Sequence, residues 1–506
     1  MSAAEPRGDD HDRLQAFLRE ETLDYCLTAM GRSREKHEQR ARPDGTDEML
    51  FGPEAVGAEM SALAAAPDDR GRVRARRRLR VRASRLIARE TGDVSRRLAQ
   101  IVHESTIRGA DDSPHSYDGT IQDLGELADS RDRTVLDDAW WSVTERLTPL
   151  HEEMWSTRRR VCLELGYSSY AAAYAHWKGL DLDRAARFAR ELLRETETVY
   201  RRGLAEATAA QLDVSSPRAA DIPRLLRGST WDRSFPPGTL VSTCVAALVD
   251  LGVDPRELEG VTIDIEPSPT KPSRPFCAAV GVPGEVYLIA RPIGGHRGYE
   301  ELLHEIGHVP HFALADPSEP WELRELQDDT VCEAQAFLVA GLLLEQRFLE
   351  NRLGMAPAEA ARFREYAAFL ETYLVRRYCV RVLSELEFHA TGVLDTTAYA
   401  EATLRHLGVT VRPASAWQDL HSGLYSVQYL EAWVLAAQLR EWLRGESGDA
   451  WFEDGRSGRS LRGLWRRSGA SSPQQLLDSA GLGQLDRHEL VRHITGPGTV
   501  PSPTPS

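Results

Sequence analysis

The sequence predicts a mainly α-helical fold with one small β-sheet. Apolar residues recur at spacings of three and four along most of the chain, which is typical of amphipathic helices. Short β-like runs are confined to one proline- and glycine-rich region, between about 214 and 297. No window holds 18 consecutive apolar residues, so no transmembrane helix is expected.

Charge and cysteine content exclude several classes of function. The 506 residues include 62 basic and 77 acidic side chains, for a formal net charge of −15. This charge repels polyanions, so nucleic acid is not an expected partner. The N-terminus lacks the basic flank and apolar core of a signal peptide, which predicts a cytoplasmic protein without membrane association. The six cysteines are far apart and form no CxxC, which favours buried free thiols over disulfides.

The chain is expected to divide into two lobes with short disordered ends. The expected parts are a disordered N-terminus over 1–10, an N-terminal helical lobe over 11–213, a second lobe over 214–495 and a disordered tail over 496–506. The amphipathic patterns of the first lobe cover 14–30, 72–100, 134–165 and 182–212. In the second lobe, helices return near Tyr299 and continue to about 445.

The predicted sheet lies just before the returning helices, over about 260–292. Its candidate strands are VTIDIE at 261–266, FCAAVGV at 276–282 and EVYLIA at 285–290. Pro283 and Gly284 predict a turn between the last two runs. The run at 276–282 therefore fits an edge strand.

A metal-binding motif stands within GYEELLHEIGHVPHF at 298–312. In HExxH on a helix, His304 and His308 lie on one face and can bind one metal ion, while Glu305 between them can act as general base. Zinc suits neutral histidine nitrogen, and a catalytic zinc site needs three protein ligands. The alternative is a purely structural helical protein in which HEIGH is incidental.

The third ligand has to come from another segment. The metzincin pattern would need glycine and histidine where His311 and Leu314 stand, so that class is excluded. The following helical segment, LQDDTVCEAQAFLVAGLLLEQRF, carries a lone acid, Glu333, among apolar residues, and an unpaired acid is costly to bury. Glu333 is the candidate ligand, with a salt bridge to a core arginine as the alternative. Asp329, one turn earlier, is placed to orient a ligand histidine.

HEIGHVPH, with DDTVCEAQAF 24 to 33 residues after its first histidine, resembles the thimet oligopeptidase and oligoendopeptidase F family of zinc metallopeptidases, whose distant kin include angiotensin-converting enzyme. RRRVCLELGYSSYAAAY at 158–174 and the section from Gly448 onward resemble two further stretches of that family. The resemblance implies a two-lobed, neurolysin-like helical metallopeptidase with a deep substrate channel. It also implies one Zn²⁺ per chain on His304, His308 and Glu333.

The other wall of the channel is expected from DLHSGLYSVQYLEAW at 419–433. Relatives use a histidine and tyrosines there to hold the substrate carbonyl and the oxyanion, which implies His421, Tyr425 and Tyr429 as catalytic residues. Ala432 stands where the second tyrosine of the family's Tyr-x-x-Tyr pair is expected. Either Tyr425 takes its role from a shifted position, or the chemistry is not ordinary peptide cleavage. An aromatic core helix is the structural alternative.

In the same relatives the edge strand before HExxH lies along the channel floor and pairs with an extended peptide. The resemblance therefore implies substrate binding by Ala278, Ala279 and Val280. Pro310 cannot donate a backbone hydrogen bond and clashes with the carbonyl one turn earlier, so the helix should kink or end there. His296 is expected at the surface.

These observations predict a zinc-dependent hydrolase of short peptides, of oligopeptidase or peptidyl-dipeptidase type, in which Glu305 moves the proton. Short peptides or peptide-like small molecules are the expected partners. The alternative, motivated by Ala432 and Pro310, is an altered relative that serves as a tailoring hydrolase or binding protein for a peptide-like metabolite.

Overall fold

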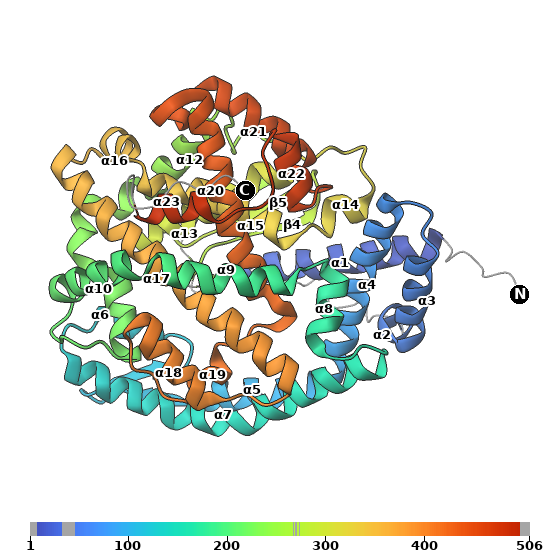
Figure 1. The fold of residues 1–506 in the computed structure, drawn as a ribbon, viewed down its shortest axis with the longest axis horizontal. Helices are drawn as coiled ribbons and strands as arrows, with labels where there is room; N and C mark the ends of the chain where they lie inside the picture. Colours follow the sequence, from blue (N-terminus) through green and yellow to red (C-terminus); the bar gives the residue numbers. More distant parts are fainter. Residues whose placement is uncertain (1–7, 33–45, 267, 269–270, 273, 496–506) are drawn as a thin grey trace, which may run out of the picture.

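The predicted mainly α-helical architecture is confirmed (Figure 1). The computed structural model describes residues 8–32, 46–266, 268, 271–272 and 274–495. The segments 1–7 and 496–506, which belong to the predicted disordered ends, lie outside the described residues. No helix in the described ranges is both long and apolar enough to cross a bilayer.

Helices account for most of the chain before residue 213. They are α1 Gly8–Ala29, α2 Thr46–Phe51, α3 Pro53–Ala64, α4 Asp69–Glu90, α5 Gly92–Glu104, α6 Thr120–Glu126, α7 Ser130–Glu164, α8 Tyr170–Lys178, α9 Leu182–Glu195 and α10 Glu197–Gln211. A short antiparallel pair, β1 Thr106–Arg108 and β2 Pro114–Ser116, interrupts them. The sequence predicted only a break here, because three-residue strands are too short to show an alternating pattern.

The rest of the chain adds further helices around the small sheet. They are α11 Ile222–Arg227, α12 Leu240–Asp250, α13 His296–Ala313, α14 Trp321–Glu325, α15 Asp329–Ala340, α16 Gln346–Leu353, α17 Pro357–Thr391, α18 Thr396–Leu407, α19 Ser415–Gln418, α20 Tyr425–Ser447, α21 Gly455–Ser468, α22 Pro473–Ser479 and α23 His488–Thr495. One continuous core of buried apolar side chains extends from α3 to α23. The division into two lobes stays a prediction.

The sheet forms where the β-like runs predicted it. Its strands are β3 Val261–Asp264, β4 Phe276–Gly281 and β5 Glu285–Ile289, in the order β3-β5-β4. The pair β3/β5 is parallel and β4/β5 is antiparallel. Within the described residues β4 pairs only with β5, so it is an edge strand, as predicted. Helix α1 packs its apolar side chains on the β4/β5 face.

The sequence predicted that the HExxH helix either kinks or ends at Pro310, and the structure decides against an end there. Pro310 lies inside α13, which continues to Ala313. The expectation that the helix ends at Pro310 is therefore wrong. A proline in the last turn removes one backbone hydrogen bond, and the turn is also held by the core: His308, Val309 and His311 are buried.

Helices α13 and α15 approach closely because a glycine lies between them. A Cβ atom on Gly307 would come within 3.0 Å of Ala336 Cα, 3.1 Å of Val339 Cβ and 3.2 Å of the Gln335 carbonyl oxygen. A side chain at this position would force the facing atoms of α15 to shift by a few tenths of an ångström, and two of the three atoms belong to its backbone. The glycine of HEIGH therefore sets the spacing at which α15 presents its side chains to the two histidines.

Replacing this glycine should separate the helices. We expect Gly307→Val to lower the free energy of unfolding by about 1–3 kcal/mol through overpacking and to weaken retention of a bound divalent ion. Thermal unfolding and metal quantification measure both effects. Gly57→Val in α3 is the matched control, because no atom lies within 4 Å of its added Cβ. Equal stability of the two variants would contradict this account.

Candidate functional site

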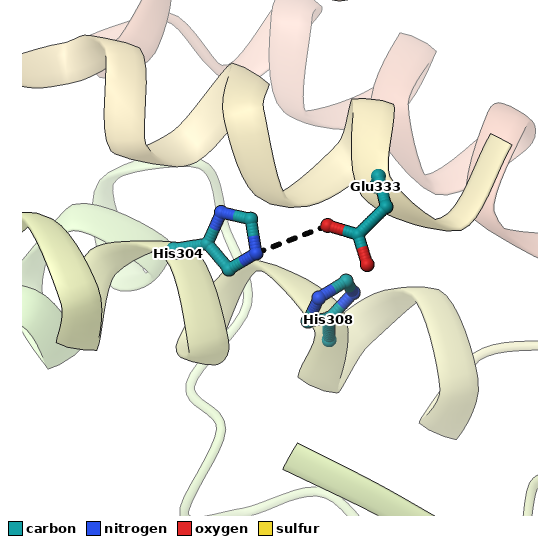
Figure 2. A group of neighbouring side chains, drawn as sticks. All are labelled: His304, His308 and Glu333. Atoms are coloured by element: carbon teal, nitrogen blue, oxygen red, sulfur yellow. Dashed lines mark ion pairs between the residues drawn. The ribbon is translucent and has the colours of Figure 1, made fainter. Parts of the chain in front are cut away.

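Two predicted histidines and the predicted acid converge between α13 and α15 (Figure 2). His304, His308 and Glu333 each offer a ligand atom, and these atoms lie within 4.8 Å of one another. His304 Nε2 is 3.1 Å from Glu333 Oε2. Figure 2 shows the two imidazoles on one helix facing the carboxylate from the other. This is the only such group of three or more His, Cys, Asp or Glu side chains in the described part of the chain.

The electrostatics of this group suit a bound cation. Burial alone would lower the pKa of His304, but the Glu333 carboxylate outweighs it and raises that pKa. Burial opposes ionisation of Glu333, yet His304 and His308 hold its pKa below the ordinary value. Burial lowers the pKa of His308 to about 4, so this ring is neutral at pH 7. Glu333 Oε2 is buried without a hydrogen bond. Two imidazoles and a carboxylate form a ligand set typical of zinc, so the residues fit that ion.

Glu305, the predicted base, lies beside the ligands and against the sheet. Its Oε2 accepts a hydrogen bond of 2.8 Å from the backbone N–H of Cys277 in β4. Burial raises the pKa of Glu305 to about 7. The edge strand thus fixes one carboxylate oxygen of Glu305.

The partners of the ligand histidines differ from what spacing suggested. Asp329 accepts a hydrogen bond of 3.0 Å from Lys178 Nζ of α8. The hydrogen bond recorded at His308 Nδ1 is with Cys332 Sγ, at 3.5 Å. A role for Asp329 in orienting a histidine stays a prediction, and Cys332 is an additional contact that the sequence analysis missed. The six cysteines are free thiols, as predicted; four are buried as expected, whereas Cys277 and Cys332 are only partly buried.

His421 lies at the predicted wall, directly before α20, but both of its ring nitrogens are engaged. Arg381 Nη1 donates to His421 Nε2 at 2.8 Å, and Ser426 Oγ is 3.2 Å from Nδ1. Burial, with help from Arg381, lowers the pKa of His421 to about 4. Because Nε2 accepts from a guanidinium, this nitrogen carries no proton with which to donate to a substrate.

The tyrosines of α20 divide into two environments. Tyr425 donates a 2.6 Å hydrogen bond to Glu333 Oε1. Tyr429 stacks on Tyr378, and within the described chain no hydrogen bond reaches its hydroxyl. Burial holds the pKa of Tyr429 well above its ordinary value, so its proton is retained at neutral pH. Tyr429 is thus the phenol free to donate to a ligand.

Ala432, where a tyrosine was expected, is fully buried in the core. Its neighbour Glu431 is paired with Arg184 of α9 at 2.7 Å, and burial raises the pKa of Glu431 to about 7. Neither residue is among those that line the cavity beside the motif. A phenol at position 432 would not face that cavity, whereas Tyr429 does.

A cavity of about 410 Å³ opens beside the motif; we call it the motif cavity. Its lining includes His304, Glu305, His421, Tyr429 and Arg381. His296 also lines it and is only 2 % exposed, so its predicted surface position is wrong. It packs among Phe235, Phe363 and Tyr366 at the start of α13.

A buried acid that the sequence analysis missed supports this wall. Glu385 of α17 is 1 % exposed, and its Oε1 accepts from the His421 backbone N–H at 2.6 Å and from Ser426 Oγ at 3.0 Å. Burial raises its pKa to about 8, so it is protonated at neutral pH. Its face of α17 also carries Arg381 and His389, one turn to either side, so the sequence does not single it out as a lone acid among apolar residues.

Comparisons with solved structures identify the fold. A protein described as oligoendopeptidase F from Bacillus anthracis superposes with a TM-score of 0.65 at 13 % identity, covering 95 % of this chain and 88 % of that one. A carboxypeptidase from Pyrococcus furiosus gives 0.61 at 16 % identity, with 96 % and 98 % covered. An M32 carboxypeptidase from Deinococcus radiodurans gives 0.58 at 14 %, with the same coverage. The chain therefore has the fold of these peptidases, in agreement with the resemblance.

No protein-family model matches this sequence, and no curated protein matches it. The likeness thus lies in the arrangement of the helices and the small sheet.

The raised pKa of Glu385 predicts that the stability of the folded protein depends on pH. Its pKa is about 8 in the folded chain and near 4.5 when unfolded. The stability that its protonated form contributes is therefore complete below pH 4.5 and is lost as the pH rises towards 8. Glu385→Gln mimics the protonated acid. We expect it to match wild type in thermal unfolding at pH 5 and to exceed it by about 1–3 kcal/mol at pH 8.5. A stability difference that is the same at both pH values would contradict the assignment.

Proposed function

We propose that this protein is a metal-dependent peptidase that hydrolyses short peptides. The observation that carries the proposal is the convergence of His304, His308 and Glu333, with Glu305 beside them at the mouth of the motif cavity. The shared fold with oligoendopeptidase F and carboxypeptidases supports the same reaction class. Zinc is the proposed ion, one per chain, and it would supply Lewis-acid activation of water and of the substrate carbonyl.

Glu305 is proposed to move the proton. Its carboxylate takes a proton from the attacking water and passes it to the leaving amide nitrogen, which breaks the peptide bond. The Cys277 N–H holds Oε2, so the carboxylate keeps one orientation through both transfers. A pKa raised by burial brings the base close to neutral pH, where such a group works best.

The α20 tyrosines are proposed to have separate tasks. Tyr425, bonded to Glu333, orients a metal ligand. Tyr429, whose proton is free, donates to the developing oxyanion. His421 is proposed to shape the cavity wall, and its catalytic role in the sequence-based hypothesis would require the Arg381 contact to open. Since Ala432 lies in the core, its lack of a phenol does not argue against hydrolysis.

The substrate backbone is proposed to lie along β4. Its outer edge is unpaired within the described residues, and the Ala278, Ala279 and Val280 segment offers backbone N–H and C=O groups to an extended peptide. Small side chains at two of these positions let a second strand approach. Short, unfolded peptides fit such a site, and endopeptidase or carboxypeptidase action depends on which end of the peptide is held.

The base assignment predicts that Glu305→Gln retains the metal and loses turnover. The ligands are unchanged while the proton acceptor is gone, so initial rates on quenched peptides should fall at least about a hundredfold. Metal quantification should give the wild-type ratio. Glu401→Gln, an exposed acid on α18, is the control and should match wild type in both measurements. Full activity of Glu305→Gln would rule out its role as base.

The two tyrosines should separate metal binding from turnover. Tyr425→Phe removes the hydrogen bond to Glu333, so metal affinity in chelator competition should fall about tenfold or more. Tyr429→Phe should leave that affinity unchanged and lower kcat by about a hundredfold or more, the cost of losing an oxyanion donor. The opposite pattern, or no change in either variant, would contradict the division of roles.

A further inference from the structure

A second cavity, of about 580 Å³, has a strongly basic lining; we call it the basic hollow. Its lining includes residues of helices α1, α4, α7 and α8, of strand β4 and of the start of α15. Its cationic lining consists of Arg19, Arg80, Arg85, Arg158 and Lys178. Apart from Ala279 and Val280 of β4, the proposed function uses none of its lining residues.

The basic hollow continues the path of a substrate along β4. Cys277 holds Glu305, and Ala279 and Val280, two and three residues further on, line the hollow. At about 3.3 Å per residue, this separation is roughly 7–10 Å. Asp329, one helical turn before the ligand Glu333, also lines the hollow. A peptide that occupies the β4 edge at the metal site thus reaches the hollow within two or three residues.

Cations outnumber acids in this lining. Five cationic side chains face only two carboxylates, Glu325 and Asp329. Arg19 is paired with Glu325 at 2.5 Å and Lys178 with Asp329 at 3.0 Å. The surplus is notable in a chain of net charge −15, because a cavity of one sign focuses the field on a ligand of the other.

Arg158 is the cation without a protein anion. Its guanidinium lies 4.5 Å over the Trp155 ring, which fixes its plane. None of the described residues accepts a hydrogen bond from it or pairs with its charge. In contrast, Arg85 is held by Glu21 at 2.9 Å, and Arg80 by the carbonyl oxygens of Leu326 and Gln327. A half-buried, oriented and unpaired guanidinium is suited to bind a carboxylate through paired hydrogen bonds.

We propose that the basic hollow binds a carboxylate of the substrate, two or three residues from the bond that is cleaved, with Arg158 as the main partner. The proposal rests on the proposed function and adds substrate class: peptides with an acidic group near the cleavage site. That carboxylate belongs to an aspartate or glutamate side chain or to the chain terminus. Both offer the same planar anion to a guanidinium.

The test uses matched peptides. Starting from any short quenched peptide that the wild type cleaves, glutamate or glutamine is placed at each position within three residues of the cleaved bond, with free and amidated C-termini. We expect kcat/KM to favour the anionic member at one position by about tenfold, the value of one charge-assisted hydrogen bond. A preference that persists in amidated peptides assigns the side chain; one that requires the free terminus assigns the terminal carboxylate.

Substitutions of Arg158 test whether this residue causes the preference for the anionic peptide. Arg158→Met should reduce it to about threefold or less while leaving cleavage of the neutral peptide within about threefold of wild type, and Arg158→Lys should restore part of it. Arg160→Met, exposed two residues along α7 and paired with Glu164, is the control. If Arg158→Met does not fold, Arg85→Met and the loss of preference at 0.5 M salt serve the same purpose.

Equal rates for all peptide pairs, or a preference unchanged in Arg158→Met, would overturn the proposal while leaving the peptidase function intact. If the wild type cleaves no peptide, the proposed function fails. Binding of the anionic and neutral peptides to Glu305→Gln then tests separately whether the basic hollow binds a carboxylate. Fluorescence anisotropy should then give about tenfold tighter binding of the anionic peptide, dependent on Arg158. No difference in binding would overturn the proposal.

Discussion

The close packing of α13 on α15 is the constraint on which the site depends. HExxH places two imidazoles on one helix face, but a third ligand is useful only if its helix lies near enough. Gly307 provides that approach, since any larger side chain would meet backbone atoms of α15 at about 3 Å. Glu333 then faces both rings, and Tyr425 of α20 holds its other oxygen. Side chains from three helices thereby form one candidate cation site.

The sheet and α17 complete this arrangement. The Cys277 N–H of β4 fixes Glu305, and Ala279 and Val280 of the same strand line the basic hollow. Glu385 and Arg381 of α17, with Ser426, fix His421. Burial drives the pKa values of Glu305 and Glu385 in the same direction, but the two acids have different neighbours. Glu305 lines the motif cavity, whereas Glu385 accepts two hydrogen bonds at Oε1 and keeps Oε2 buried without a partner.

Features with a local physical signal could be predicted from the sequence. Helical periodicity, the strands before HExxH and the lone acid at 333 each leave such a signal, and the structure brings the predicted ligands together. The Arg381–His421 contact joins side chains 40 residues apart, and the Lys178–Asp329 pair joins side chains 151 residues apart. Residue spacing cannot supply those contacts. For the same reason, spacing did not reveal that Ala432 faces the core and Tyr429 the cavity.

The central claim is that two imidazoles and one carboxylate hold a single divalent ion. X-ray absorption at the zinc edge of the metal-loaded protein measures this ligand set directly. The account predicts scattering from two imidazole rings and from oxygen at about 2.0–2.2 Å, with no sulfur. A sulfur scatterer at about 2.3 Å, as Cys332 beside His308 would give, or fewer than two imidazoles, would contradict it.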